Sequence, residues 1–353
     1  MPKIVISILS YNGEQHLLNC LQSISNIDYS KNAYDVIILD NASSDSSIQI
    51  IKNNYPEYRL IESKVNTGFA GGNNIVWQIA RNLKADYLLL LNQDTIVEPD
   101  FLSKLVSMAE TDSTIAACQS LMMLWHKKDL INSYGNALHY LGFGYAGGYL
   151  SKKPELSIAQ LNQAVDVGYA SGGCVLYRMS ALERVGLFDE EFFAYHEDLD
   201  LSWKLRLAGY RVVLAPSSVI YHNYEFSRSI KKYYWMEKNR FVVFLTNYKL
   251  LTILLMLPMA LITEIGLFLF SIKSGFYIHK LKAYLFFLKP QSWHYLKKRR
   301  QFINSMRVVS DQKILLYMTG KILFQDIQNP ILTHIFNPIC NIYFKLIKEI
   351  IYW

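Results

Sequence analysis

Cysteine is scarce in this sequence, and its four residues lie far apart. The chain has 353 residues, no Cys-x-x-Cys pair, and cysteines at Cys20, Cys118, Cys174 and Cys340. This spacing suits neither a structural zinc site nor the dense disulfides of a small secreted domain. We therefore expect reduced thiols, in a chain that is long enough to bury a sizeable hydrophobic core.

Targeting and nucleotide-binding signatures are also missing. Residues 1–9 lead directly into an apolar, β-branched run, without the charged, hydrophobic and small-residue regions of a signal peptide. This predicts that residues 1–222 stay in the cytoplasm.

The glycine-rich segment 66–74 has neither the GxGxxG nor the GxxxxGK[ST] spacing, which disfavours a dinucleotide-dependent oxidoreductase and a P-loop nucleotidase. Its glycines could still let backbone N–H groups approach a phosphate at a helix start.

Acidic residues are few in the last third of the chain. Residues 1–222 carry 17 Lys and Arg against 23 Asp and Glu, whereas residues 223–353 carry 19 against 6. Such an asymmetry predicts that the two parts have different roles. We place the boundary near residue 225, with a domain over 1–225 and a basic, helical region over 226–353.

One long apolar run, residues 250–272, lies in the basic region. Its length is close to the roughly 20 residues that span a bilayer, but Pro258 and Glu264 interrupt it. Lysines lie on both sides, so the charge asymmetry that orients a span is absent. A shallow interfacial contact, a true span and a buried core helix all remain open. The basic run 297–300 predicts either contact with anionic headgroups or a solvated helix face.

Short apolar runs alternate with helical patterns in the first part. The predicted strands are 4–9, 36–39, 87–91, 211–215 and 219–221, and the predicted helices are 15–24, 46–53 and 194–208. This alternation is typical of a doubly wound, mostly parallel sheet flanked by helices. Residues 125–165 are rich in Gly and Tyr, and we interpret them as a loop or hairpin whose rings either stack on sugars or pack the hairpin.

Ligands of such sheets bind at the carboxyl ends of the strands, where the strand order reverses. Asp94 follows a buried strand, and its carboxylate there requires a cation or a helix to cap. Mn²⁺ or Mg²⁺, which prefer oxygen ligands, would satisfy it. His222, after a later strand, is either a second ligand or an ordinary polar residue.

Three acids stand close together at Glu197, Asp198 and Asp200. Like charges this close raise one another's pKa, so the clustering of these three carboxylates requires a structural or functional explanation. A helix start would compensate them partly, or one could accept a proton from an attacking hydroxyl. Asp198 is the preferred base, because Asp200 lies further round the helix and one side must face the core with Trp203. With a nucleotide diphosphate as leaving group, one base and one metal site suffice for sugar transfer.

In this order, the motifs closely resemble those of family 2 glycosyltransferases with the GT-A fold. The resemblance covers roughly residues 3–225 and is strongest to the rhamnosyltransferase-like branch that builds bacterial surface polysaccharides. The motifs are Ser10-Tyr11-Asn12, Asp40-Asn41, Asn66 to Asn73, Leu91-Asn92-Gln93-Asp94, Gly172-Gly173, and Phe188 to Asp200 with its His196-Glu197-Asp198 core.

The resemblance implies a role for each matching residue. Tyr11, Asn12 and Asp40 would hold the base and ribose, and Asn66, Gly71 and Asn73 would shape the same pocket. Asp94 would be the main metal ligand, with Asn92 at the first position of the Asp-x-Asp motif and His222 as a further metal or diphosphate contact. Asp198 would be the base, and Gly172 and Gly173 would leave room for the acceptor, which Glu197 and Trp203 would border.

The implied protein is an α/β GT-A enzyme with a C-terminal helical, membrane-associating extension. It would be an inverting, metal-dependent glycosyltransferase that moves one sugar, L-rhamnose from dTDP-rhamnose, to a polyprenyl-linked or growing polysaccharide. It would work at the cytoplasmic membrane face as a peripheral or monotopic protein, with no nucleic-acid partner. The missing Gln-x-x-Arg-Trp motif favours one sugar per encounter. Alternatives are a UDP-hexose or UDP-galactofuranose donor, a non-catalytic sugar- or nucleotide-binding component, and a nucleotidyltransferase.

Overall fold

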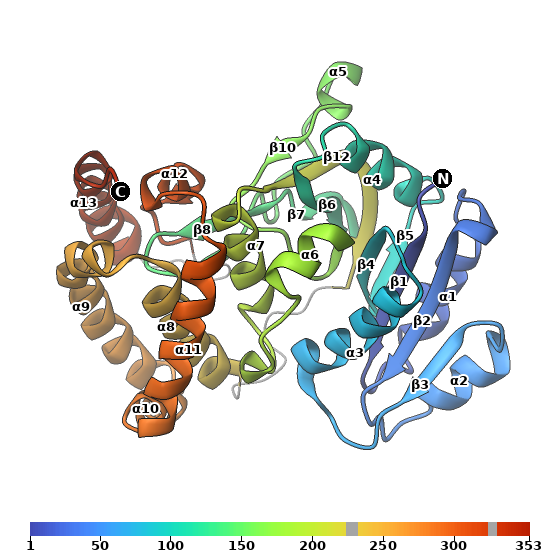
Figure 1. Ribbon diagram of the computed structural model, residues 1–353, viewed down its shortest axis with the longest axis horizontal. Coiled ribbons are helices and arrows are strands. Elements are labelled where there is room, and N and C mark those ends of the chain that lie inside the picture. The colour runs from blue at the N-terminus through green and yellow to red at the C-terminus, as the bar shows by residue number, and fades with distance from the viewer. Residues whose placement is uncertain (224–231, 324–329) are drawn as a thin grey trace. The chain divides into compact units, whose positions relative to one another are not determined.

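The computed structural model describes residues 1–223, 232–323 and 330–353 (Figure 1). Its contacts divide the chain into two compact units. The first comprises residues 1–136, 146–193 and 210–225, and the second comprises 137–145, 194–209 and 226–353. Two shorter segments, 137–145 and 194–209, group with the C-terminal region.

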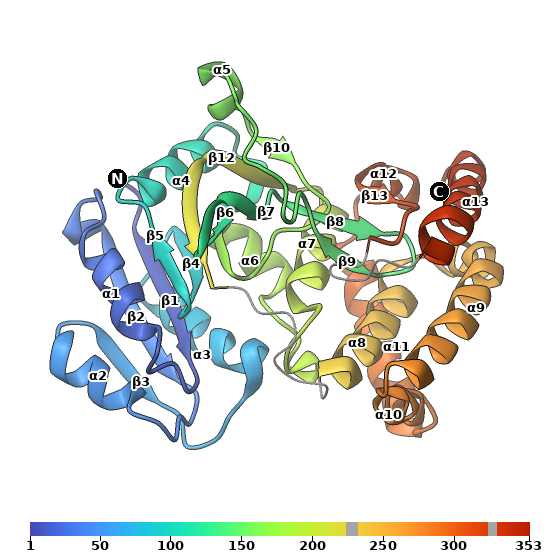
Figure 2. The same ribbon diagram turned by 180° about the vertical axis from the view of Figure 1, so that it is seen from behind.

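A mixed sheet forms the centre of the first unit (Figures 1 and 2). Among the described residues it has ten strands, in the order β10-β12-β6-β11-β4-β1-β2-β3, with β5 beside β12 and β7 beside β6. They are β1 (Ile4–Ser10), β2 (Tyr34–Asp40), β3 (Arg59–Glu62), β4 (Tyr87–Asn92), β5 (Thr95–Val97), β6 (Ile115–Leu124), β7 (Lys127–Ser133), β10 (Val165–Asp166), β11 (Cys174–Arg178) and β12 (Arg211–His222).

The strand directions confirm the expected fold class. β1 pairs in parallel with both β2 and β4, and β6 pairs in parallel with β12, while β11 runs antiparallel between β4 and β6. The chain moves outward from β1 to β3 and then returns to β4 on the other side of β1. The order therefore reverses between β1 and β4, where ligands of open α/β sheets bind.

Helices cover both faces of this sheet, as the continuous apolar strands predict. The helices are α1 (Leu17–Ser25), α2 (Ser47–Asn54), α3 (Gly68–Asn82), α4 (Phe101–Glu110), α5 (Ile158–Leu161) and α6 (Met179–Val185). Ile4, Ile6 and Ile8 of β1 pack in one hydrophobic cluster with α1, α2 and α4. Ser7 points to the other face, where its hydroxyl donates to Asn73 Oδ1 of α3 over 3.0 Å.

The second unit is mainly helical. It contains α7 (Glu197–Leu207), α8 (Lys232–Asn247), α9 (Leu250–Lys273), α10 (Tyr277–Phe287), α11 (Pro290–Met306), α12 (Asp311–Ile314) and α13 (Asn337–Ile350), and a small sheet of β8 (Asn136–His139), β9 (Gly144–Ala146) and β13 (Met318–Thr319). α7 begins later than predicted, because Tyr195 and His196 adopt left-handed φ angles of 67° and 68°. It contacts α8, α11 and α12.

The Tyr- and Gly-rich segment is a set of short strands, as one alternative for it predicted. Tyr140, Phe143 and Tyr145 are buried around the ring of His139, whose pKa burial lowers to about 3. These rings pack the protein interior and are not available to stack on a sugar.

Candidate active site

Backbone and amide hydrogen bonds join the strand ends at the carboxyl edge of the sheet. Tyr11 N–H donates to Gln93 Oε1, and Gln93 Nε2 donates back to Tyr11 O, each over 3.0 Å. Asn92 N–H donates to Gly173 O over 2.9 Å. Residues from three separate motifs of the sequence therefore meet after β1, after β4 and before β11.

Asp94 and His222 form a close pair at this edge. His222 Nε2 lies 3.3 Å from Asp94 Oδ1, and both residues are buried. His222 ends β12 and lies opposite Thr95 in the antiparallel pairing with β5, so the strand register brings the two side chains together. The sequence predicted both residues but could not show that they meet.

Asn132 and Asn92 hold the ring of His222 beside Asp94. Its Nδ1 lies 3.0 Å from Asn132 Oδ1. In the tautomer with its proton on Nδ1, the ring offers the Nε2 lone pair as a metal ligand next to the Asp94 carboxylate. Asn92 Nδ2 also approaches Nε2, at 3.4 Å.

These residues fit a divalent metal that shares its ligands with a substrate. Among the described residues, no group of three or more His, Cys, Asp or Glu side chains gathers around one point. Mg²⁺ and Mn²⁺ commonly use one or two protein ligands and complete their shell with phosphates and water. Asp94 and His222 provide such an incomplete set.

Two buried oxygens near the end of β2 lack partners within the described part of the chain. Asp40 is fully buried, and its Oδ1 accepts from Ser43 N–H over 2.9 Å. Asp40 Oδ2 and Ser10 Oγ accept no hydrogen bond there. Buried polar atoms rarely remain unpaired in native proteins, so this pair is suited to a polar ligand such as a nucleobase or ribose.

The loop after β1 frames the same region. Asn12 adopts a left-handed φ of 47°, and its Oδ1 accepts from Ser44 N–H over 2.8 Å, which ties this loop to the one after β2. The Tyr11 side chain is 47% exposed and leaves an aromatic face open to a ligand.

The glycine-rich segment before α3 is braced by the protein itself. Gly68 N–H donates to Asn66 Oδ1 over 2.8 Å, and Ala70 N–H donates to Phe193 O over 3.0 Å. Two of the N–H groups in this segment, those of Gly68 and Ala70, therefore bond to protein oxygens. Gly68 needs to be glycine, because its φ is 72° and a Cβ there would lie 2.3 Å from Phe193 O.

Four further predicted residues in the first unit are buried and differ in the space around them. Asn73 is buried; its Oδ1 accepts from Ser7 Oγ and its Nδ2 donates to Phe69 O. It can therefore shape the pocket only by stabilising the backbone of β1 and α3. Gly71 is packed on Thr67, whose Cβ would lie 2.8 Å from an added Cβ. Gly173 has more space, since an added Cβ would meet Met122 Cε at 3.4 Å. Gly172 is buried beside it.

At the start of α7, Glu197 and Asp198 differ in environment. Asp198 is half-buried, and its Oδ1 accepts from Leu199 N–H over 2.7 Å. Glu197 is buried, and its Oε2 has no partner among the described residues. Burial and the nearby Asp198 charge raise the pKa of Glu197 well above its usual range. Asp198 is therefore the better candidate for a charged proton acceptor.

Asp200 and Trp203 face the interior of the second unit. Asp200 accepts hydrogen bonds from Asn247 Nδ2 (3.0 Å) and from Arg299. Its burial agrees with the choice of Asp198 as the candidate base. The prediction that Trp203 borders an acceptor is corrected, because its side chain is fully buried and packs edge-on against Tyr248 with ring centroids 4.6 Å apart.

Two residues of the basic run 297–300 differ from both predictions made for the run. Arg299 is buried against Asp200, and Arg300 Nη1 donates to Leu245 O over 2.6 Å. Only Lys297 and Lys298 of this run are exposed. Half of the run therefore holds the second unit together.

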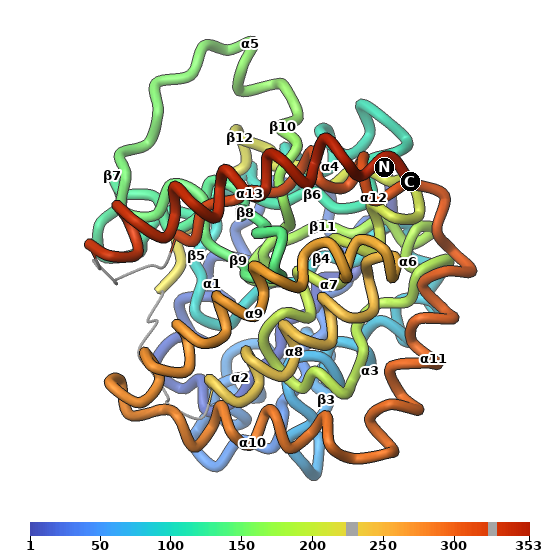
Figure 3. The backbone as a smooth tube through the Cα atoms, turned by 90° about the vertical axis from the view of Figure 1, so that its left-hand side faces the viewer, coloured from blue at the N-terminus to red at the C-terminus, as the bar shows by residue number. Residues whose placement is uncertain are grey.

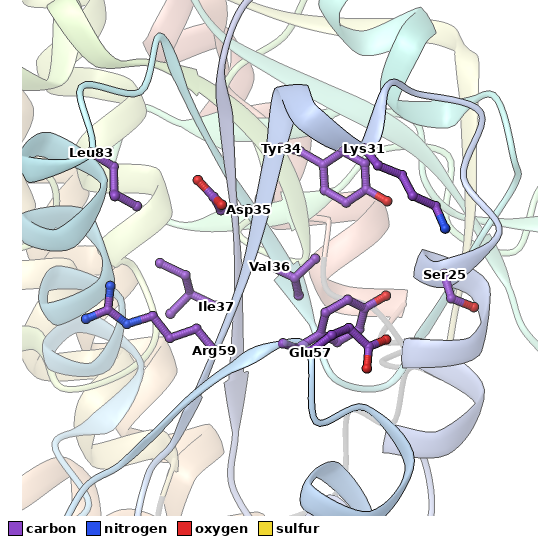
Figure 4. A pocket seen from close by; sticks show the side chains of 10 residues that line it. Ser25, Lys31, Tyr34, Asp35, Val36, Ile37, Glu57, Arg59 and Leu83 are labelled. Carbon is purple, nitrogen blue, oxygen red and sulfur yellow. The ribbon is translucent and has the colours of Figure 1, made fainter.

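A cavity of about 330 Å³ lies at the opposite end of the sheet (Figure 4). Figure 4 shows Tyr34, Asp35, Val36 and Ile37, from the start of β2, among its lining residues. These positions are at the amino end of a parallel strand, so the cavity is separate from the carboxyl edge where the candidate residues gather.

One contributor escaped sequence reasoning. Asn132 lies on β7 and its Oδ1 is 3.0 Å from His222 Nδ1, but nothing near it in the sequence marks it as part of a site. Its role depends on the pairing of β7 with β6, which no local pattern reveals.

Comparison with known proteins places these observations in a family. The model of the family "Glycosyl transferase family 2" matches residues 5–186. N-acetylglucosaminyl-diphospho-decaprenol L-rhamnosyltransferase of Mycobacterium tuberculosis is 25% identical over 233 residues, which are 61% of this chain and 74% of that protein. Poly-beta-1,6-N-acetyl-D-glucosamine synthase of Staphylococcus aureus is 24% identical over 217 residues, and the chain spans 48% of its length.

Solved structures show the same fold. A mannosyltransferase from Pyrobaculum calidifontis in complex with GDP-Man and Mn²⁺ is 14% identical with a TM-score of 0.51, covering 86% of each chain. TarS 1–349 of S. aureus in complex with UDP is 15% identical with a TM-score of 0.51, covering 98% of this chain and 90% of that one. At these identities the likeness concerns the fold, and it supports the expected GT-A architecture.

Proposed function

The chain belongs to glycosyl transferase family 2, and we propose that it moves one L-rhamnose from dTDP-rhamnose to a lipid-linked or growing polysaccharide, with inversion. The observation that carries this proposal is the Asp94–His222 pair, 3.3 Å apart at the carboxyl edge of a family 2 sheet. The L-rhamnosyl group and the lipid-linked acceptor of this proposal are supported by the relative from M. tuberculosis, whose name contains both.

In this proposal each group of residues has one task. Ser10 and Asp40, with their unpaired buried oxygens, bind the base or ribose, and Tyr11 stacks on it. Asp94 and His222 hold a divalent metal, which when bound neutralises charge on the leaving diphosphate. Asp198 accepts the proton of the acceptor hydroxyl as that oxygen attacks the anomeric carbon. The enzyme acts at the cytoplasmic face of the membrane, where a lipid-linked acceptor is exposed.

A panel of nucleotide sugars tests the donor. Thermal unfolding is measured with dTDP-rhamnose, UDP-glucose, UDP-galactose and UDP-galactofuranose, each with Mn²⁺, with Mg²⁺ and with EDTA. A ligand at 100 times its dissociation constant stabilises the folded state by about 2.7 kcal/mol, which such a scan resolves. We expect a metal-dependent rise with dTDP-rhamnose that Asp94→Asn abolishes.

Two other outcomes would replace the proposal. A metal-dependent rise with a UDP-sugar alone would keep the enzyme class and change the donor. Binding of a donor without hydrolysis or transfer under any condition would favour a non-catalytic sugar- or nucleotide-binding component.

A further inference from the structure

The outer faces of two helices in the second unit are apolar. On α9 the exposed side chains recur every three or four residues, at Leu250, Leu254, Leu257, Leu261, Ile265 and Leu269. On α13 and the turn before it they are Ile335, Ile339, Ile342, Leu346 and Ile350. Ile265 is 65% exposed and Leu346 is 61% exposed. Contiguous apolar surface of this kind marks an interaction site.

The two helices contact each other. α9 contacts α13, and the Tyr343 hydroxyl on α13 donates to Leu255 O on α9. Figure 3 shows α13, α9 and α10 on the side of the second unit that is turned to the viewer. We call the exposed aliphatic residues of α9 and α13 given above the aliphatic face.

α9 is the one helix among the described residues that is long and apolar enough to cross a membrane. Only 22% of its most apolar stretch is buried, so it is not the core helix that the sequence left as one alternative. Its polar contacts decide between the other two alternatives.

Glu264, past the middle of α9, is fixed by charged partners on the neighbouring helices. Arg240 of α8 lies 2.7 Å from its Oε2, and Lys280 of α10 pairs with its Oε1. The same two cations hold Glu237 of α8, at 2.9 Å from Arg240 and 2.6 Å from Lys280. Lys280 is fully buried.

This cluster ties α9 along its side to α8 and α10. A membrane-crossing α9 would carry Glu264 into the hydrocarbon and separate it from Arg240 and Lys280. An intramembrane carboxylate is strongly unfavourable, and Arg240 and Lys280 would be left to share the single carboxylate of Glu237. A helix that lies along the interface keeps all of these pairs.

The charges around the aliphatic face match an anionic lipid surface. Lys273 at the end of α9, Lys282 on α10 and Lys345 on α13 are exposed. Glu349 is the one exposed acidic side chain within the described part of residues 232–353. Cations beside an apolar helical face are typical of helices that bind at the headgroup level. Two copies of the chain would instead bring like charges together.

We propose that the aliphatic face inserts into the cytoplasmic leaflet of an anionic bilayer, with α9 and α13 in the membrane plane and α9 not crossing. This inference rests on the membrane-face location in the proposed function and specifies how the chain is held there. It also assigns to α13 a membrane contact that its sequence did not suggest.

Flotation with lipid vesicles tests the surface. The full chain is mixed with vesicles of equal parts phosphatidylcholine and phosphatidylglycerol, and with vesicles of phosphatidylcholine alone. We expect Leu261→Gln with Ile265→Gln, and separately Ile342→Gln with Leu346→Gln, to weaken binding about tenfold or more, because each pair loses two lipid-facing side chains. Val65→Gln with Ile158→Gln is the matched control, since these exposed aliphatics lie in the first unit. Unchanged binding in both helix variants would overturn the proposal.

Labelling decides the orientation of α9. Lys249→Cys and Lys273→Cys place one thiol at each end, and the native cysteines are buried. A membrane-impermeant maleimide added outside the vesicles should modify both thiols. Modification of one end only until detergent is added would show a span and overturn the proposal.

Catalysis is measured separately, so the two proposals can fail independently. Donor turnover with a water-soluble acceptor should be the same in the helix variants and the wild type. If the helix variants lose vesicle binding but keep turnover, the result supports the membrane role of the aliphatic face. If the wild type binds vesicles but has no turnover, the result contradicts the proposed function alone. A dimer that the helix variants dissociate, with no vesicle binding, would assign the face to a second copy.

Discussion

Arg299 of α11 donates a hydrogen bond to Asp200 of α7, and both side chains are almost completely buried. Asn247 of α8 donates to the same carboxylate over 3.0 Å, and Lys204 lies 3.6 Å from it. The helix that carries the candidate base Asp198 in its first turn is therefore fixed by the C-terminal helices. The basic region thus has a structural role within the second unit in addition to any contact with lipid.

This pair gives the first prediction. Arg299→Met should lower the free energy of unfolding by about 3–5 kcal/mol, because it leaves Asp200 buried without its main cation. Urea unfolding measures the change. Lys104→Met breaks the exposed pair with Asp100 and should cost less than about 1 kcal/mol. Adding Asp200→Asn to Arg299→Met should recover part of the loss, and equal losses in Arg299→Met and Lys104→Met would contradict the role of the pair.

The second prediction concerns the metal pair. Asp94→Ala should abolish metal-stimulated turnover and weaken donor binding, because His222 alone cannot hold a hard divalent cation. Turnover is measured against Mn²⁺ concentration, and donor binding by calorimetry. Asp86→Asn, at the amino end of the same strand region, should leave both unchanged. An Asp94→Ala enzyme that still responds to Mn²⁺ would exclude this residue as the ligand.

The third prediction separates the base from the donor site. Asp198→Asn should lower the turnover number by roughly 10²–10⁴-fold while donor binding stays nearly intact, because proton acceptance acts only in the transition state. Glu191→Gln removes an exposed acid upstream in the same segment and serves as the control. If Asp198→Asn weakens donor binding as much as Asp94→Ala does, the assigned roles are wrong.

The fourth prediction concerns pH and Glu197. Burial and Asp198 raise its folded-state pKa, so the folded protein retains a proton that the unfolded chain releases near pH 4.3. Stability from this group is greatest below that pH and declines as pH rises toward the folded-state pKa. Glu197→Gln should therefore become increasingly more stable than the wild type as the pH rises above about 4. Parallel stability curves, measured by urea unfolding at each pH, would argue against the raised pKa.

Local patterns in the sequence determined much of the first unit. The apolar runs at Ile4–Ser10 and Tyr87–Asn92 form strands that are buried on both faces, where their backbone N–H and C=O groups pair with neighbouring strands. The polar residues that follow these strands then emerge at one edge of the sheet. For this reason the α/β class and the location of Asp40 and Asp94 could be predicted before any contact was known.

Contacts between distant segments decided the rest. Asp94 and His222 are far apart in the chain and meet through the pairing of β5 with β12, while Asn132 joins them through β7. From the sequence, Trp203 was expected to border a ligand and Arg299 to be a surface cation, yet both are buried in the second unit. The sequence by itself determined which segments are strands and helices, because periodicity and burial act locally. Only the tertiary structure decided which polar side chains pair and which remain open, because that depends on strand register and helix packing between residues remote in sequence.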